Sequence, residues 1–248
     1  MSRSAPALRD DSLLPSLHAV HRTRIRPFQA VLFDLDGVLL DTETLYTVGI
    51  QEVVGSFGKT YDWALKRDMM GKSELVGAHL LIERLGLPLH AEEYLARVNP
   101  VFERLFHSVE PMPGAVALVE YLLERQVPLA IATSSRSHLF ALKSRPHGWL
   151  HSIRAVVCGD DAQVKALKPA PDIFLAAAAR LQVPPAACLV VEDSPAGVSS
   201  ALAAGMQVVA LPDPALGHDA VAHATTIVSS HDELRNLLSA LLEAGELP

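Results

Sequence analysis

The sequence predicts an α/β protein in which a doubly wound parallel sheet is interrupted by an inserted domain made of helices. Three observations support this prediction. Short apolar runs recur along the chain with helical patterns between them, polar residues gather directly after several of these runs, and residues 45–106 show helical patterns without a convincing strand. Strands that alternate with helices are typical of a doubly wound sheet.

The expected strands are short runs of consecutive apolar residues, the pattern of strands that are buried on both faces. The first, residues 30–33, is followed at once by Asp34. Five similar runs follow at residues 127–133, 155–158, 188–191, 207–211 and 226–228.

Helical patterns lie between the runs, at residues 114–125, 172–181 and 194–204. The last of these has clear ends, because Ser194 suits an N-cap, Pro195 suits the first helical position, and Gly205 follows the end. Four further helices are expected at residues 44–54, 62–70, 73–85 and 91–106.

These elements predict three parts of the chain. Residues 1–29 form a flexible N-terminal extension, residues 30–44 and 107–248 form the α/β core, and residues 45–106 form the inserted helical domain. Ligands of open α/β sheets bind outside the carboxyl ends of the strands, so an insertion that leaves this edge is placed to act as a lid.

Composition excludes several classes of partner. The chain has 21 Lys and Arg against 28 Asp and Glu, a formal net charge of −7, which disfavours a nucleic acid polymer as partner. No apolar run is long enough to predict a membrane span. The two cysteines, Cys158 and Cys188, lie in apolar runs and predict buried free thiols in a reducing compartment, for which we expect the cytoplasm.

The first 29 residues are rich in Arg, Ser and His and show no periodicity. They fit either a flexible tail or an organelle transit peptide, and Asp10 and Asp11 count against the second interpretation. The apolar centre of a secretory signal is not seen in them.

Chemistry-bearing side chains follow the predicted strands, and parallel strands end at one edge of a sheet. They are Asp34 and Asp36, Thr133 with Ser134 and Ser135, Lys168, and Glu192 with Asp193. Crowded carboxylates repel one another, and Mg²⁺ resolves this because it prefers oxygen ligands. A hydroxyl, an ammonium and a metal could hold a dianionic group while one carboxylate acts as nucleophile and another as general acid and base. Each residue alone also fits a helix cap or an ordinary surface group, and the ordered set favours function.

These residues resemble the motifs of a known superfamily. The run Asp-Leu-Asp-Gly-Val-Leu-Leu-Asp-Thr-Glu at residues 34–43 is similar to the first motif of the haloacid dehalogenase (HAD) phosphatases. Thr133, Lys168 and the pair Glu192-Asp193 match the second, third and fourth motifs, and the resemblance extends over residues 30–214. It implies a Rossmann-like, HAD-like core and an α-helical cap at the position of the inserted domain.

The resemblance also implies roles and Mg²⁺ as cofactor. Asp34 would be the nucleophile and a metal ligand, and Asp36 the general acid and base with its backbone carbonyl on the metal. Thr133 would bind phosphoryl oxygens, Lys168 would neutralise charge, Asp193 would bind the metal, and Glu192 would be a further ligand or a water-mediated partner. Leu167 departs from the pattern, because many relatives have Gly before the lysine, and the loop 160–167 is therefore expected to take another path.

The motifs also narrow the range of reactions that the chain could catalyse. Dehalogenases lack the second Asp of the first motif, so Asp36 disfavours dehalogenation. Tyr46 stands where the phosphomutases carry a His, which favours release of phosphate to water. Residues 133–137, 159–161, 192–198 and 203–209 resemble the pseudouridine-5′-phosphatase and glycerol-3-phosphatase branch. This implies a monomeric phosphatase for a small phosphorylated metabolite, first pseudouridine 5′-phosphate, with glycerol 3-phosphate or a β-phosphoglucomutase-like isomerisation as alternatives.

Substrate contacts are expected from two loops. Ser134, Ser135 and Arg136 follow the second strand, and Lys72 lies between two helices of the insertion. The alternatives are that Lys72 is solvated beside a helix start and that Arg136 pairs with an acid. Trp63, with Tyr61 nearby, fits core packing of the insertion better than stacking on a base.

Overall fold

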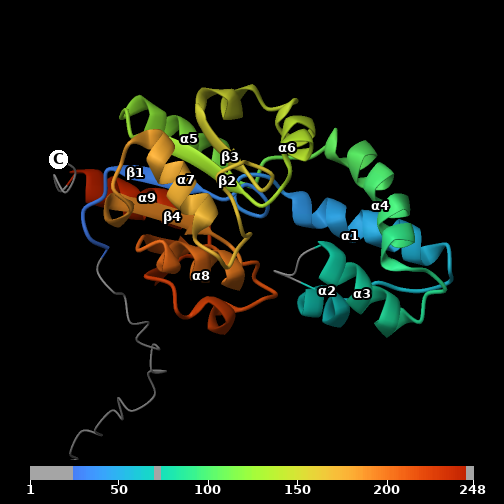
Figure 1. Cartoon of the computed structure of the whole chain (residues 1–248). Coiled ribbons are helices and arrows are strands. Elements are labelled where there is room, and N and C mark those ends of the chain that lie inside the picture. Colours follow the sequence, from blue (N-terminus) through green and yellow to red (C-terminus); the bar gives the residue numbers. More distant parts are fainter. Residues whose placement is uncertain (1–24, 70–73, 244–248) are drawn as a thin grey trace, which may run out of the picture.

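A computed structural model describes residues 25–69 and 74–243 and contains a six-stranded parallel sheet (Figure 1). The strands are β1 (Ala30–Phe33), β2 (Leu129–Thr133), β3 (Ala155–Cys158), β4 (Cys188–Glu192), β5 (Gln207–Ala210) and β6 (Thr226–Ile227). Their order across the sheet is β3-β2-β1-β4-β5-β6, and every neighbouring pair is parallel. The doubly wound sheet expected from the sequence is confirmed.

Helices cover both faces of the sheet, which explains why its strands are uninterrupted apolar runs. Val31 and Phe33 of β1 face one hydrophobic cluster, which includes residues of α5 (Ala115–Glu124) and α9 (His231–Glu243). Ala30 and Leu32 face a second cluster, which includes residues of α7 (Asp172–Leu181) and α8 (Pro195–Ala203). The strand interior is therefore apolar on each side, and chemistry is confined to the strand ends.

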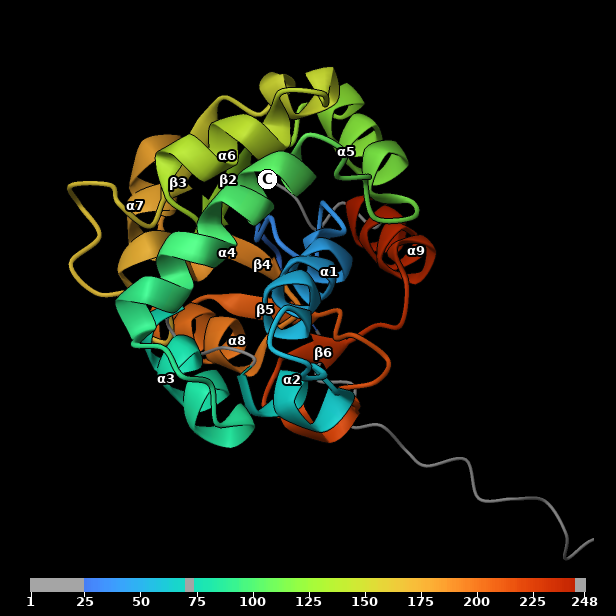
Figure 2. The ribbon, with the colours of Figure 1, turned by 90° about the vertical axis from the view of Figure 1, so that its right-hand side faces the viewer.

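The helices that follow β1 pack around a hydrophobic cluster of their own. They are α1 (Thr42–Gly55), α2 (Trp63–Met69), α3 (Glu74–Leu85) and α4 (Ala91–Phe106). Figures 1 and 2 show this group beside the end of the sheet, and α4 contacts α6 (Ser137–Ser144) of the core. The helix α1 begins two residues before the expected position 44, because the Asp41 side chain caps it by accepting a hydrogen bond from Thr44 N at 3.2 Å.

The structure moves one expected boundary. Ile25 and Phe28 are only 4 % and 2 % exposed and belong to the core cluster of β1, although residues 1–29 were expected to be a flexible extension. The Arg26 backbone also exchanges two hydrogen bonds with the Gln207 side chain, at 2.6 and 3.0 Å. The packed chain therefore includes residues 25–29, because their apolar side chains complete the core, and residues 1–24 lie outside the described part.

Two helices, α6 and α9, were not expected from the sequence. The short helix α6 buries Lys143 and Ser144 rather than an apolar stripe, so it lacks the periodic signal of a core-facing helix. The helix α9 does carry such a signal in Leu234 and Leu238, which are both fully buried. Cys158 and Cys188 are free and buried, as predicted.

Candidate active site

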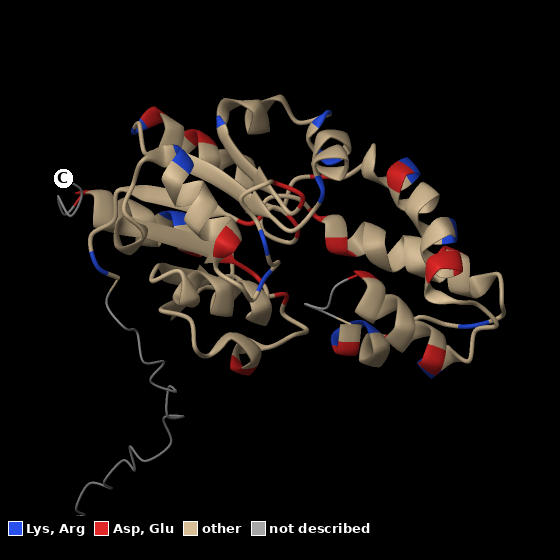
Figure 3. Ribbon diagram, viewed as in Figure 1, with Lys and Arg blue, Asp and Glu red and all other residues tan. Residues whose placement is uncertain are grey.

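The polar residues that follow the strands meet at the switch point of the sheet. β1 lies between β2 and β4, and the strand order reverses there, which is where open α/β sheets bind ligands. Asp34 follows β1, Thr133 ends β2, and Glu192 ends β4, so the topology brings them together. Figure 3 shows acidic segments gathered where the sheet approaches the start of α1.

Lys168 joins the carboxylates of this edge. Its Nζ donates to Asp34 Oδ1, to Glu192 Oε1 at 2.7 Å and to Ala132 O at 3.0 Å. The Lys168 side chain is 7 % exposed, and those of Asp34 and Glu192 are 8 % and 1 % exposed. Burial would lower the pKa of Lys168, but the charges of Asp34 and Glu192 raise it above its ordinary value. The ammonium therefore stays charged beside the candidate nucleophile.

Glu192 is held by the two residues that precede α8. Its Oε2 accepts hydrogen bonds from Asp193 N at 2.9 Å, from Ser194 N at 3.0 Å and from Ser194 Oγ at 3.0 Å. Gly197 makes this possible, because a Cβ at position 197 would overlap the Glu192 carboxylate. Both carboxylate oxygens are thus occupied by protein donors, which favours a positioning role for Glu192 over direct metal ligation.

Asp34, Glu192 and Asp193 form a buried acidic cluster in which one carboxylate oxygen from each residue lies within 4.8 Å of the other two. Burial raises the pKa of Asp34 to about 7, with Lys168 opposing and the other carboxylates adding to the rise. Burial and the charge of Glu192 raise the pKa of Asp193 in the same direction. Gly37, at a φ of +82°, lets the Asp193 carboxylate come so close that a Cβ at position 37 would overlap it.

This donor set fits a hard divalent cation. Among the described residues, three buried carboxylates face the ammonium of Lys168, so the negative charge of this cluster exceeds the positive charge. Such crowding raises carboxyl pKa values, and a cation with oxygen ligands relieves it. Mg²⁺ matches both the oxygen donors and the excess charge.

Asp36 sits in a second network that the sequence did not predict. Its Oδ2 accepts from Ser135 Oγ at 2.9 Å and from Thr133 Oγ1 at 3.1 Å, and its Oδ1 accepts from Lys143 Nζ at 2.5 Å. Burial would raise the pKa of Asp36, but the charge and hydrogen bond of Lys143 outweigh it and lower that pKa. The motifs do not point to Lys143, and its one signal in the sequence is a lysine directly after the apolar run of residues 139–142.

The expected substrate contacts fall into different places. Ser135 is half-buried and joins the Asp36 network, while Ser134 and Arg136 are exposed at the start of α6. Lys72 lies outside the described residues. Trp63 is 38 % exposed, so it is less buried than the packing interpretation predicted.

Tyr46 of α1 lies beside the Asp36 network, where it contacts Lys143. Its hydroxyl lies 3.1 Å from Lys143 Nζ, and its ring packs edge-on against Phe102 and Phe106 with centroids 4.9 and 5.2 Å apart. Burial raises the pKa of Tyr46 to about 12, with Lys143 opposing, so the phenol stays neutral.

The loop that carries Leu167 delivers Lys168 to the site in spite of its departure from the common motif. The loop is fixed by the Asp172 side chain, which accepts hydrogen bonds from Lys165 N at 2.8 Å and from Ala166 N at 3.0 Å. Leu167 itself is 42 % exposed. The lysine therefore reaches Asp34 without a glycine before it.

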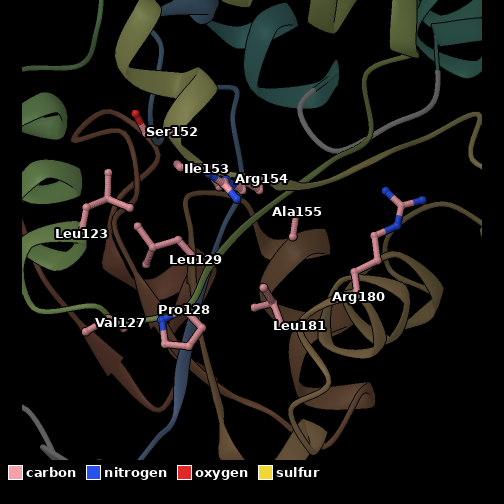
Figure 4. A pocket seen from close by; sticks show the side chains of 10 residues that line it. All are labelled: Leu123, Val127, Pro128, Leu129, Ser152, Ile153, Arg154, Ala155, Arg180 and Leu181. Atoms are coloured by element: carbon pink, nitrogen blue, oxygen red, sulfur yellow. The ribbon is translucent and has the colours of Figure 1, made fainter.

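A cavity of about 380 Å³ lies at the opposite edge of the sheet (Figure 4). It is lined at the amino ends of β2 and β3, among others by Leu129 and Ala155. The candidate site residues do not line it, and its wall combines apolar side chains with those of Arg154 and Arg180. The buried carboxylates, rather than this cavity, mark the site.

A parallel sheet with charged side chains at its switch point defines an α/β enzyme whose site lies at the carboxyl ends of the strands. The pattern of the haloacid dehalogenase-like hydrolases matches residues 28–205. The chain belongs to this family, and it is a phosphoric monoester hydrolase, as its relatives are.

Two relatives share 43 % identity with the chain. One is a probable pseudouridine-5′-phosphatase of Drosophila melanogaster, matched over 210 residues that cover 83 % of this chain and 91 % of that protein. The other is (DL)-glycerol-3-phosphatase 2 of Arabidopsis thaliana, matched over 192 residues that cover 75 % and 80 %. The predicted branch of the family is confirmed, and both activities occur in it.

Solved structures agree with this assignment. A HAD family hydrolase from Deinococcus radiodurans, with bound phosphate and sodium, superposes with a TM-score of 0.75 at 30 % identity and covers 90 % of this chain and 99 % of its own. A putative β-phosphoglucomutase from Thermotoga maritima gives a TM-score of 0.70 at 33 % identity, with 86 % and 99 % covered. Within residues 25–69 and 74–243, we find no helix that is both long and apolar enough to span a membrane.

Proposed function

We propose that the chain is a Mg²⁺-dependent phosphatase that hydrolyses pseudouridine 5′-phosphate through an aspartyl-phosphate on Asp34. The observation that carries the proposal is the buried pairing of Asp34 with Lys168 at the switch point, with Asp36 two residues further on. A nucleophilic carboxylate, a neutralising cation and a separate acid are the three groups that such a reaction needs.

The metal would be held by the carboxylates of Asp34 and Asp193 and by the backbone carbonyl of Asp36. Glu192 would keep this geometry through its hydrogen bonds with Lys168 and with the backbone of Asp193. When bound, Mg²⁺ supplies positive charge to the phosphoryl oxygens and shields them from the carboxylates.

The chain's own residues would carry out two displacements. An Asp34 oxygen attacks phosphorus, and the bond from phosphorus to the ester oxygen breaks as Asp36 passes a proton to the departing alkoxide. Asp36 is ionised before substrate binds, so this proton would arrive on the phosphate group of the substrate and pass through Asp36. Asp36 then takes a proton from water, whose oxygen attacks phosphorus and breaks the bond to Asp34, which releases phosphate. Lys168 balances the charge on Asp34 and on the transferring group. Thr133 would bind the phosphoryl oxygens after its hydroxyl turns away from Asp36 Oδ2.

We base the choice between two candidate substrates on the residues that follow β2. The two 43 % identical relatives support pseudouridine 5′-phosphate and glycerol 3-phosphate about equally. The run Ser134-Ser135-Arg136 favours the former, because it resembles the pseudouridine-phosphate enzymes more. The putative mutase among the solved structures keeps isomerisation as the second candidate, and Tyr46 in place of the mutase His argues against it.

The test is phosphate release by the purified protein with Mg²⁺. Pseudouridine 5′-phosphate, uridine 5′-phosphate, glycerol 3-phosphate and glucose 6-phosphate are compared, with Asp34→Asn as the blank. We expect pseudouridine 5′-phosphate to give the highest kcat/KM and the blank to release no phosphate. A preference for glycerol 3-phosphate would overturn the substrate, and full activity of Asp34→Asn would overturn the nucleophile. β-Glucose 1-phosphate is assayed as a fifth compound, and its conversion to an isomer without free phosphate would establish the isomerase.

We also infer that the enzyme works as a monomer in the cytoplasm on a small metabolite. Sedimentation velocity tests the first point. A fluorescent fusion with and without residues 1–29 tests the second, because relocation on deletion would establish the transit peptide instead.

A further inference from the structure

Lys143 is a fully buried lysine whose position the two displacements above do not explain. It belongs to α6, and its side chain is 0 % exposed. An ammonium that is removed from water is costly unless it is paired and fully hydrogen-bonded. Its surroundings must therefore be arranged to keep it there.

Three polar atoms and two aromatic rings enclose the ammonium. Lys143 Nζ lies 2.5 Å from Asp36 Oδ1, 2.9 Å from Ser135 Oγ and 3.1 Å from Tyr46 Oη. The ring centroids of Phe106 and Tyr46 lie 4.5 and 5.1 Å away, within the range of cation–π contact.

The consequence for Asp36 is that both of its carboxylate oxygens are held. Lys143 takes Oδ1, while the hydroxyls of Ser135 and Thr133 take Oδ2. A carboxylate with donors on both oxygens is ionised and has one orientation. A group that must take up a proton and pass it to a departing oxygen depends on such placement.

The same ammonium also contacts the first and the last of the four helices that follow β1. Tyr46 lies in the first turns of α1, and Phe106 is the last residue of α4. One side chain thus connects the acid and base candidate with the two ends of the inserted helices.

We propose that Lys143 is a positioning residue that orients Asp36 for proton transfer to the leaving group. The inference rests on the proposed function, since it takes Asp36 as the acid. Lys143 acts through Asp36 and Ser135, and it binds neither substrate nor metal.

The test compares leaving groups. Pseudouridine 5′-phosphate and glycerol 3-phosphate are esters of a primary alcohol and need a proton on the departing oxygen, whereas 4-nitrophenyl phosphate releases a stable phenolate. Release of the alcohol or phenol in the first turnover is measured with enzyme in excess and Mg²⁺ present, so that its rate reports formation of the aspartyl-phosphate. A correctly placed acid accelerates such a step by about 10²–10⁴-fold. We expect Lys143→Met to slow the alkyl esters by about 10²-fold or more and 4-nitrophenyl phosphate by less than tenfold.

Controls separate this role from simple damage to the fold. Lys59→Met removes an exposed lysine and should change neither rate. Ser135→Ala and Tyr46→Phe serve if Lys143→Met does not fold, because each removes a single contact without leaving a charge unpaired. Both variants should slow the alkyl esters more than 4-nitrophenyl phosphate, by a smaller factor than Lys143→Met. An equal loss on both kinds of ester in these variants, or unchanged rates in Lys143→Met, would overturn the role of Lys143. Asp36→Asn distinguishes the two proposals, because a variant at 36 without leaving-group selectivity would refute the acid itself.

Discussion

Replacing Gly197 by alanine should destabilise the protein even though the position is helical. Gly197 lies in α8, where alanine ordinarily improves helix propensity by about 1 kcal/mol. A Cβ there would overlap the Glu192 carboxylate, which Lys168, Asp193 and Ser194 hold in place. The sign of the effect therefore depends on whether Glu192 can leave its position at low cost.

The contacts of Glu192 set the magnitude. Its carboxylate accepts four hydrogen bonds of 2.7–3.0 Å, one of them from an ammonium, and it is 1 % exposed. Breaking one partner out of a buried ion pair costs about 3–5 kcal/mol. After the helix gain of about 1 kcal/mol, the net loss in the free energy of unfolding is about 2–4 kcal/mol. For a chain of this size that lowers Tm by roughly 4–16 °C.

Urea denaturation and thermal melting measure the loss, and phosphate release should fall with it because Lys168 loses a partner. Gly148→Ala is the matched control, since Gly148 is exposed and a Cβ there meets no atom within 4 Å. The Gly197→Ala substitution is also made in a Glu192→Ala background, where the clash is absent and alanine should be neutral or stabilising. Equal costs in the two backgrounds, or a raised Tm for Gly197→Ala alone, would refute the reasoning.

Two further predictions concern the metal and the pH dependence of folding. Saturating Mg²⁺ near 100 Kd should add about 2.7 kcal/mol to the free energy of unfolding. Asp193→Asn should need far more Mg²⁺ for the same rise, because the cluster loses a carboxylate. Calorimetric titrations of Asp193→Asn that coincide with those of wild type and of the exposed control Asp219→Asn would contradict the ligand assignment. Burial lowers the pKa of His231 below 6.5, and its Nε2 lies 2.7 Å from Val38 O. As pH falls below about 6.5, the unfolded chain therefore binds a proton on His231 before the folded chain does, so the folded state loses stability. Between about pH 7.5 and pH 5.5, the free energy of unfolding of His231→Gln should fall by less than that of wild type. Equal falls in urea denaturation would argue against this role of His231.

Much of the fold followed from the sequence, because its signals are local. Strands buried on both faces must be continuous apolar runs, and all six such runs form strands. The helix α8 was predicted with its cap, since Ser194 Oγ accepts from Gly197 N at 3.0 Å. The shared edge of Asp34, Thr133 and Glu192 also followed, because parallel strands that end in polar residues end together.

The sequence alone determined which residues stand at the strand ends and the family to which their order belongs. Only the tertiary structure decided how they are paired. Lys143 meets Asp36 across 107 positions and Lys168 meets Asp34 across 134 positions. Both pairs form only when the sheet brings the segments that follow its strands together. A buried lysine leaves no periodic signal in a short helix, because its partners, Asp36, Ser135 and Tyr46, come from other segments. The physical reason is that burial of a charge is decided by the atoms around it in space, whereas a strand or a helix cap is decided by its neighbours along the chain.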